Sequence, residues 1–467
     1  MTPAKIYFIG ICGTAMGNGA LLLREMGYQV SGSDENVYPP MSELLSASGI
    51  KIFSGYDPSH FTQKPDLVVI GNAISRGNAE VEYVLNEKLP YTSLAELLKN
   101  YLIQGKESIV ISGTHGKTTT SALAAWVFHS AGFEPNFLVG GVLENFGRGY
   151  QARPKSQYVI LEGDEYDTAF FDKRSKFLHY MPTTLIINNI EFDHADIFSS
   201  LDEIKLSFKR LVNLVPKNGI IIANGDDRNV QDVISQSFAP IETFGLSSNC
   251  DWQAGNISSK SSSTSFDLLL FGKVEAQFEV NLLGEFNIKN ALAVTIAASH
   301  HGISYEEIQK AFSTFKNVKR RLEFKGEYNG IKVYDDFAHH PTAIRETLKA
   351  FRTKYPTERI IAIFEPRSNT TRRNIFQKEL AECFADADVV FISQIARLNL
   401  LPESERLDPE KVIADIRAQG KEAFYLPDAE TISTNVAEIV KQGDVIIVMS
   451  NGSFGGIHGM LKKKLSL

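Results

Sequence analysis

Cysteine is scarce in this sequence of 467 residues. Cys12, Cys250 and Cys383 lie far apart, with neither the spacing of a metal site nor that of a disulfide framework. Such usage is typical of a protein that stays in a reducing compartment. We therefore expect a cytoplasmic location.

Long apolar runs are also missing. No stretch approaches the roughly 18 apolar residues of a membrane-spanning helix. The run from Ile6 to Ile11 is too short, and too soon followed by glycine, for a signal peptide. We expect no contact with a membrane.

The sequence also has no excess of positive charge. The formal net charge is −7, which argues against a general nucleic-acid binder. A chain of this length is too long for one hydrophobic core, so two to four domains are expected. We expect a monomer or a weak homodimer.

One stretch combines a predicted strand, a glycine loop and a predicted helix. Ser108–Ser112 is rich in Ile and Val, and the loop Gly113–Thr119 (GTHGKTT) leads from it into an Ala-rich segment. In this arrangement backbone N–H groups hold phosphate oxygens, Lys117 reaches the β- and γ-phosphates, and Thr118 offers its hydroxyl to Mg²⁺. The usual motif has glycine where Ile111 stands, so an ordinary strand-to-helix turn is the alternative.

A second glycine loop lies near the N-terminus. Lys5–Ile9 predicts a strand, a G-x-x-G-x-x-x-G turn begins at Gly10, and a second predicted strand ends at Asp34. Glycines at a helix N-terminus and a following acid suit a diphosphate and a ribose. Because the spacing is not G-x-G-x-x-G, we expect a nucleotide diphosphate but no NAD site. A glycine turn without a ligand is the alternative.

Two acidic clusters follow predicted strands of the next unit. Gln157–Leu161 leads to Glu162–Asp167, and Thr184–Ile190 leads to Glu191–Asp196. In open α/β sheets, ligands bind outside the carboxyl ends of the strands. Together with the glycine loop, the clusters predict one site for Mg²⁺ and a triphosphate. Taken alone, each cluster is as often a solvated loop.

The later part of the chain carries weaker signals. Alternating runs between Lys260 and Leu283 predict antiparallel hairpins, and from Phe324 the pattern returns to α/β. Asn287 and Asn290 share one face of a predicted helix, although asparagine in a first turn is more often only a cap. The pair His339-His340 could bind a metal, but the sequence shows no third ligand.

Four motifs together resemble those of the Mur ligases, the ATP-dependent amide-forming enzymes of peptidoglycan synthesis. These are GTHGKTT at 113–119, NIEFDH at 189–194, GEFNIKN at 284–290 and DDFAHHP at 335–341. The resemblance covers the whole chain. Three further strings, at 31–42, 170–176 and 365–370, resemble the branch that joins L-Ala-γ-D-Glu-meso-diaminopimelate to UDP-N-acetylmuramate. The alternative is the branch that adds L-alanine to the same sugar nucleotide.

This resemblance implies an α/β protein of three domains. Residues 1–105 would form a Rossmann-like domain for the UDP-sugar. Residues 106–322 would form a P-loop ATPase-type domain with a mostly parallel sheet and appended antiparallel strands. Residues 323–467 would form a Rossmann-like domain that closes on ATP and binds the peptide acceptor. The implied cofactors are ATP and Mg²⁺, and the implied substrates are UDP-N-acetylmuramate and the murein tripeptide.

The resemblance also implies roles for single residues. Lys117, Glu162 and His194 would be catalytic. Thr118 and Glu162 would bind one Mg²⁺, and His194 would bind a second. The implied ATP-binding residues are Gly113, Thr114, His115, Gly116, Lys117, Thr118, Thr119, Asn290, Arg321 and Asp336. The implied UDP-sugar-binding residues are Gly10, Cys12, Gly13, Thr14, Ser33 and Asp34.

One position departs from the pattern of several relatives, which carry a carbamylated lysine shortly after the D-H motif. Phe208 stands there in this chain, with Lys209 beside it. The alanine-adding branch also lacks that lysine, so the departure fits the branch and leaves the ligands of a second metal open.

The reaction explains why these residue types are needed. A carboxylate and an ammonium do not condense at neutral pH, whereas an acyl phosphate has a phosphate that can leave. Catalysis is then mostly positioning and charge neutralisation. His194, Asp193 or water could accept the proton of the incoming amine.

The acceptor peptide carries carboxylates, and an Arg fork binds a carboxylate bidentately. We therefore expect Arg367, together with Asn369, to contact the peptide. An ordinary surface position for Arg367 is the alternative.

Two other classes of function stay open at this point. A P-loop NTPase switch or motor would need a GTP-specificity motif or an arginine finger, and no convincing one is evident. A sugar-nucleotide binder without enzymatic activity is the other class, and Lys117 and Thr118 argue against it.

Overall fold

Five parallel strands form the sheet of the N-terminal part, in the order β3-β2-β1-β4-β5. The structure is a computed structural model that describes residues 5–396 and 398–466. Alternate residues of β1 enter two core clusters, Ile6 and Phe8 on one face and Tyr7 and Ile9 on the other. The elements are β1 (Lys5–Ile9), α1 (Thr14–Glu25), β2 (Gln29–Asp34), α2 (Met41–Ala47), β3 (Lys51–Ser54), β4 (Leu67–Ile70), α3 (Ala79–Asn86), β5 (Tyr91–Ser93) and α4 (Leu94–Leu98).

Ten strands form the central sheet, in the order β17-β16-β15-β14-β13-β12-β6-β9-β7-β8. The run from β15 to β7 is parallel, and β16, β17 and β8 pair antiparallel at its two ends. The strands are β6 (Glu107–Ser112), β7 (Asn136–Leu143), β8 (Arg148–Gln151), β9 (Tyr158–Gly163), β12 (Thr184–Ile187), β13 (Ile220–Asn224), β14 (Ile241–Gly245), β15 (Trp252–Ser259), β16 (Thr264–Leu270) and β17 (Lys273–Val280). The helices are α5 (Lys117–Ser130), α6 (Leu201–Val212), α7 (Arg228–Ile234), α8 (Glu285–His300) and α9 (Tyr305–Thr314), and β10 (Asp167–Ala169) pairs with β11 (Asp172–Ser175) in a separate hairpin.

Six strands form the C-terminal sheet, in the order β18-β19-β23-β20-β21-β22. Only β18 runs antiparallel to its neighbour. The two faces of this sheet belong to separate core clusters. One cluster includes residues of α10 and α12, and the other includes residues of α13 and α14. The elements are β18 (Glu323–Tyr328), β19 (Ile331–Asp336), α10 (Pro341–Lys354), β20 (Ile360–Phe364), α11 (Gln377–Glu382), β21 (Val389–Ser393), α12 (Pro409–Ala418), β22 (Glu422–Leu426), α13 (Ala429–Ile439), β23 (Val445–Met449) and α14 (Ile457–Leu465).

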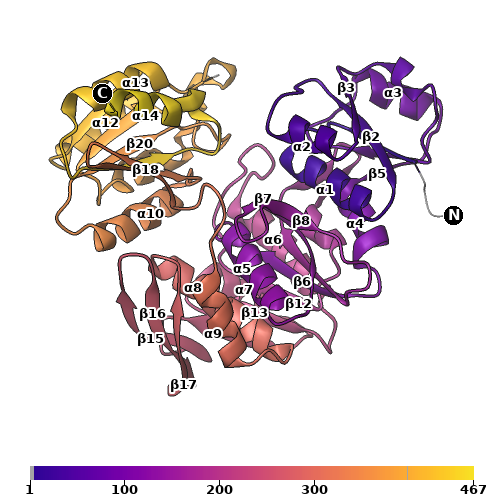
Figure 1. Ribbon diagram of the computed structural model, residues 1–467, viewed down its shortest axis with the longest axis horizontal. Helices are drawn as coiled ribbons and strands as arrows, with labels where there is room; N and C mark the ends of the chain where they lie inside the picture. Colours follow the sequence, from indigo (N-terminus) through magenta and orange to yellow (C-terminus); the bar gives the residue numbers. More distant parts are fainter. Residues whose placement is uncertain (1–4, 397, 467) are drawn as a thin grey trace.

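In the view of Figure 1, the N-terminal part lies at the upper right of the central part and the C-terminal part at its upper left. The N-terminal part contacts the β7–β8 hairpin through α1, where Arg148 Nη1 lies 2.7 Å from Glu25 Oε1. The C-terminal part approaches α8 through α10, where Lys349 Nζ lies 2.7 Å from Glu285 Oε2. Among the described helices, none is both long and apolar enough to cross a membrane.

The predicted α/β class is confirmed, including the antiparallel strands appended to the central sheet. The sequence patterns miss the edge strands β3, β5 and β18, because these strands are short or half-exposed and lack a continuous apolar run. They also miss β7, β8, β14 and β22. The predicted strand Thr184–Ile190 ends earlier, at Ile187, so Asn188 and Asn189 already belong to the loop that follows β12.

Candidate active site

A cavity of about 1510 Å³ is lined by residues of all three parts. β12, β6 and β9 are neighbours, with Ile187 opposite Ser112 and Ser112 opposite Gly163, so their carboxyl ends meet at one edge of the sheet. The glycine loop and both acidic clusters therefore reach the same cavity, because Lys117, Glu162 and His194 all line it.

Glycine is required at two positions of the loop between β6 and α5. Gly113 and Gly116 have φ angles of 134° and 81°. A Cβ on Gly116 would lie 2.8 Å from Asn290 Oδ1, and one on Gly113 would lie 3.0 Å from the backbone of Asn189. Gly116 precedes α5, and no side chain caps the first N–H groups of that helix. Those N–H groups face the cavity side of the loop, which suits phosphate oxygens.

Lys117 is buried at the base of this loop. Its Nζ donates to Gly113 O at 2.7 Å and lies 2.9 Å from Glu165 Oε2. Burial disfavours the charged lysine, but the carboxylates Glu165, Asp164 and Glu162 outweigh it and raise the pKa of Lys117. The ammonium is therefore charged and held at the loop before any ligand arrives.

Glu162 and Thr118 place two oxygens side by side. Thr118 Oγ1 donates to Glu162 Oε1 at 2.6 Å, Arg321 Nη2 donates to Thr118 Oγ1 at 3.1 Å, and Gly140 N donates to Glu162 Oε2 at 2.7 Å. Burial and the nearby Asp164 raise the pKa of Glu162. A hydroxyl and a carboxylate at the edge of a phosphate loop are the donors that Mg²⁺ prefers, so this pair fits that ion.

Glu165 joins two of the expected catalytic residues. Its Oε2 accepts from Lys117, and its Oε1 lies 3.1 Å from His194 Nε2. Burial opposes its charge, yet Lys117 and His194 lower the pKa of Glu165 to about 2. Burial also opposes the charge of His194, but the hydrogen bond to Glu165 raises its pKa to about 9. In the sequence Glu165 belongs to an acidic cluster, but no pattern indicates a role for it. Its partners Lys117 and His194 lie far away in the sequence.

Asn290 lies beneath the loop and belongs to an amide cluster. Asn188 Nδ2 donates to Thr120 Oγ1 at 3.0 Å and to Asn290 Oδ1 at 3.4 Å, and Asn290 Nδ2 donates to Asn287 Oδ1 at 3.1 Å. α8 begins after Gly284 without any side-chain cap. The interpretation of these asparagines as helix caps is therefore wrong, and Asn290 supports the phosphate loop instead.

The N-terminal loop is held from behind by Asp34. Its carboxylate accepts from Cys12 N and from Asn36 N, each at 2.9 Å, while Ser33 Oγ donates to the buried Glu80. Among the UDP-sugar residues expected from the sequence, Cys12, Gly13 and Thr14 line the cavity. Gly10, Ser33 and Asp34 lie behind the loop and shape it, since Gly10 N donates to Ser33 O at 2.8 Å.

Asp336 lines the cavity, but protein groups already occupy its carboxylate. Leu322 N and Ala338 N donate to it, each at 2.8 Å, and Thr347 Oγ1 donates at 3.3 Å. Burial raises the pKa of Asp336. A segment that includes Leu322 connects the central and C-terminal parts. Asp336, at the end of β19, therefore holds this segment against the C-terminal part.

The loop after β20 contacts the second acidic cluster. Thr370 Oγ1 donates to the buried Asp193 Oδ1 at 2.6 Å, and Asn369 Nδ2 donates to Asp196 Oδ2 at 2.8 Å. Arg367 is exposed and lies over Gly452, where an added Cβ would be 2.0 Å from its Nη1. Neither Arg367 nor Asn369 is among the residues that line the cavity in the described part of the chain.

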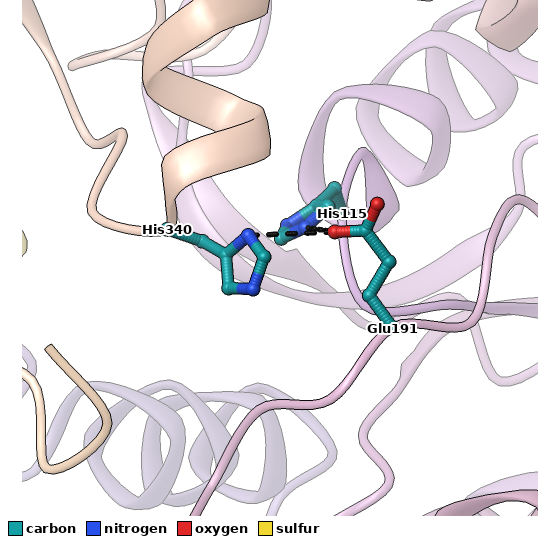
Figure 2. A group of neighbouring side chains, drawn as sticks. All are labelled: His115, Glu191 and His340. Atoms are coloured by element: carbon teal, nitrogen blue, oxygen red, sulfur yellow. Dashed lines mark hydrogen bonds and ion pairs between the residues drawn. The ribbon is translucent and has the colours of Figure 1, made fainter. Parts of the chain in front are cut away.

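His340 of the C-terminal part lies beside two residues of the central part (Figure 2). His115 Nε2 is 2.9 Å from Glu191 Oε2, and His340 Nδ1 is 3.4 Å from the same oxygen. The His339-His340 pair thus separates: His339 Nε2 faces Asp193 at 3.8 Å, whereas His340 meets His115 and Glu191. The sequence could not reveal this cluster because its members come from three distant segments.

Family models match most of the chain. The Mur ligase family catalytic domain matches residues 5–105, the Mur ligase middle domain matches 111–298, and the Mur ligase glutamate ligase domain matches 320–452. The chain belongs to the Mur ligase family.

Full-length relatives of this Mur ligase fall into two named groups. The Escherichia coli protein named UDP-N-acetylmuramate–L-alanyl-gamma-D-glutamyl-meso-2,6-diaminoheptandioate ligase is 43% identical over 98% of this chain and 97% of its own. A UDP-N-acetylmuramate–L-alanine ligase of Trichlorobacter lovleyi is 33% identical over 99% of both chains. The crystal structure of a murein peptide ligase from Psychrobacter arcticus is 38% identical and superposes with a TM-score of 0.74, covering 99% of this chain and 98% of that one.

Phe208 is part of the core in this Mur ligase. It is fully buried in α6, and its ring makes an edge contact with Phe177 at 5.2 Å. Lys209 is directed instead to Asp232, with Nζ 3.3 Å from Oδ1. A carbamylated lysine at position 208 would have to displace this aromatic packing.

Proposed function

We propose that this protein is an ATP-dependent ligase that joins L-Ala-γ-D-Glu-meso-diaminopimelate to the lactyl carboxylate of UDP-N-acetylmuramate, through an acyl phosphate, in the recycling of cell-wall peptides. The observation that carries this proposal is the 43% identity along the whole chain to a ligase of that name. The second candidate, addition of L-alanine, is favoured only by the lower identity of 33% to the alanine ligases.

Each part of the chain has its own task in this proposal. Residues 1–105 bind the UDP-sugar, 106–322 bind ATP, and 323–467 close over ATP and carry the peptide site. The cavity lined by all three parts supports this division, because the reaction needs three substrates at one place.

The loop Gly113–Thr119 holds the phosphates of ATP in this proposal. Its glycines permit the backbone conformation, and Lys117 supplies the charge for the γ-phosphate. Asn290 and Arg321 flank the loop, and Thr118 and Glu162 would hold one Mg²⁺. His194 would hold a second Mg²⁺ after giving up the proton that it shares with Glu165. A bound Mg²⁺ supplies neutralisation of the negative charge on the triphosphate.

The lactyl carboxylate requires a cation of its own. Lys117 and Lys176 are the two buried lysines in the described part of the chain, and both line the cavity. Lys176 Nζ is 3.5 Å from Asp164 Oδ2 and 4.0 Å from the ring centroid of Tyr166, so its ammonium keeps free N–H groups. We assign Lys176 to the carboxylate of the sugar nucleotide and Lys117 to the phosphates.

The peptide acceptor brings several carboxylates to the C-terminal part. The Arg367 side chain is exposed, and its guanidinium lies over Gly452. It follows β20, next to the β12 loop that Asn369 and Thr370 contact. We assign Arg367 and Asn369 to the peptide carboxylates, which reach the cavity from the side of the third domain.

The deciding experiment supplies ATP, Mg²⁺ and UDP-N-acetylmuramate with either the tripeptide or L-alanine, and follows phosphate release and product mass. We expect one phosphate per amide bond with the tripeptide. If the protein uses L-alanine but not the tripeptide, the tripeptide is not the acceptor, although the protein is still a ligase. Phosphate release without an amide product would point to an NTPase switch, and no release at all to a binding protein.

The contact of Arg367 is tested separately. Arg367→Ala should raise KM for the tripeptide and leave KM for UDP-N-acetylmuramate unchanged. An unchanged tripeptide KM would remove Arg367 from the acceptor site without affecting the assignment of the reaction.

A further inference from the structure

His115, Glu191 and His340 form a cluster of metal-binding side chains apart from the Thr118–Glu162 pair. His115 lies in the phosphate loop, Glu191 follows β12, and His340 immediately precedes α10 (Figure 2). One ligand atom from each lies within 4.8 Å of the others. Two domains therefore contribute ligands to one point.

The separations suit an ion of small coordination number. Two ligands at about 2.1 Å from a tetrahedral ion lie about 3.4 Å from each other. His115 Nε2 and His340 Nδ1 lie 2.9 Å and 3.4 Å from Glu191 Oε2. The ring centroids of the two histidines are 4.6 Å apart, so neither ring blocks the other. Small side-chain rotations would bring all three atoms onto one ion.

The hydrogen bonds of His340 leave its Nδ1 unprotonated beside Glu191. Its Nε2 is 3.2 Å from Phe192 O, a carbonyl that can only accept, so Nε2 carries the ring proton. Its Nδ1 is then unprotonated; it accepts weakly from Thr342 N at 3.3 Å and faces the Glu191 carboxylate. Burial lowers the pKa of His340 to about 3, which keeps the ring neutral. Two electron-pair donors face each other here, an arrangement that a cation stabilises.

An ion can reach this cluster from the cavity. His115 and Glu191 line the cavity, with side-chain exposures of 18% and 34%, whereas His340 is 4% exposed and closes the far side. Thr342 Oγ1 donates to Glu191 Oε1 at 3.1 Å and so orients the carboxylate. The site is therefore open on one side and supported on the other.

We propose that His115, Glu191 and His340 bind a transition-metal dication, with Zn²⁺ as the best fit, and that this ion ties α10 of the C-terminal domain to the phosphate loop. Two imidazoles and one carboxylate are a donor set that zinc takes and that Mg²⁺ avoids. The ion takes the place of the proton that His115 Nε2 now shares with Glu191. Its fourth position opens to the cavity, where water or another oxygen ligand completes the shell.

The test titrates the full-length protein with Co²⁺ in the presence of excess Mg²⁺, which occupies oxygen-rich sites. We expect one equivalent of Co²⁺ to give the intense visible absorption of a four-coordinate ion, and Zn²⁺ to abolish it. His340→Asn is the main variant, because asparagine keeps the cap on Thr342 N but removes the imidazole. Its Co²⁺ affinity should fall by more than about 100-fold, since even the loss of a supporting contact costs 10–100-fold.

Two further variants guard the interpretation. Glu191→Gln should also lose the Co²⁺ spectrum. His300→Asn should keep it, because the His300–Glu242 pair at 2.9 Å has no second histidine. Zn²⁺ should raise the unfolding temperature of the wild type but not that of His340→Asn. Wild-type protein without the four-coordinate spectrum, or a spectrum that survives in both His340→Asn and Glu191→Gln, would overturn the site.

Discussion

At the scale of single residues, the buried lysines Lys117 and Lys176 differ in how fully their charges are paired. Lys117 has a carbonyl and a carboxylate within 3 Å of its ammonium, whereas Lys176 has one carboxylate at 3.5 Å. A buried lysine without full pairing carries a desolvation cost that a bound anion offsets. The two lysines should therefore respond differently to substitution.

Substitution of Lys117 should abolish turnover by removing charge stabilisation of phosphoryl transfer. We expect Lys117→Met to lower kcat by at least about 100-fold, the usual effect of losing one such group. The same change leaves Glu165 buried without its cation, so stability should fall as well. In the double variant Lys117→Met/Glu165→Gln the unfolding temperature should recover while activity does not. A single variant within tenfold of wild-type kcat would exclude Lys117 from phosphate binding.

Substitution of Lys176 should instead weaken binding of the sugar nucleotide. Lys176→Met should raise KM for UDP-N-acetylmuramate by about 10- to 150-fold, equivalent to the 1.5–3 kcal/mol of a hydrogen bond to a charged group. Lys173→Met is the matched control, because Lys173 lies in β11, just before Lys176 in the chain, and its side chain is 70% exposed. Its KM should stay within about twofold of wild type. Equal effects of the two variants would contradict the assignment of Lys176.

At the scale of elements, the sequence predicts what is local. The strand, loop and helix around Lys117 follow from an apolar run, two glycines and an Ala-rich segment, and they are β6 and α5 in the fold. α8 is buried on nearly all sides, so its sequence lacks an amphipathic period that would show which face meets the loop. The pairs Glu165–His194 and Glu191–His340 depend on how strands and domains come together, which no local pattern encodes.

The loop after β20 offers a buried and an exposed contact to one acidic segment. Thr370→Val removes one of the two hydrogen bonds that Asp193 Oδ1 accepts, the other coming from His194 N at 2.7 Å, and this loss costs about 1–3 kcal/mol. Amide hydrogens of residues 192–196 should then exchange faster by roughly 5- to 150-fold. Asn369→Ala removes an exposed contact and should change exchange little. The reverse order of the two effects would show that the buried bond does not hold this segment.

At the scale of the whole molecule, the segment between the central and C-terminal domains determines how the cavity can close. In this segment the backbone φ angles of Asn317, Arg320 and Leu322 are 69°, 62° and 49°. Residues other than glycine rarely adopt this left-handed conformation. Leu322 N is fixed to Asp336, so rotation about the segment would move the whole third domain. Arg367 and Asn369, which we propose for the peptide carboxylates, lie on that domain and do not line the cavity. In this proposal they need such a movement to bring the peptide to the acyl phosphate.

We therefore expect the third domain to close when ATP and UDP-N-acetylmuramate are bound. Small-angle scattering should show a smaller radius of gyration when a non-hydrolysable ATP analogue and UDP-N-acetylmuramate are present together, because closure excludes water from an intermediate that hydrolyses. The proposed site of the sugar nucleotide lies in the N-terminal part, so the sugar nucleotide alone should change the radius less. Lys117→Met, which weakens the phosphate site, should reduce the compaction at equal ligand concentration. If the radius is the same with and without both ligands, the three substrates must meet in the arrangement seen here, and Arg367 is then too far from the cavity to hold the peptide.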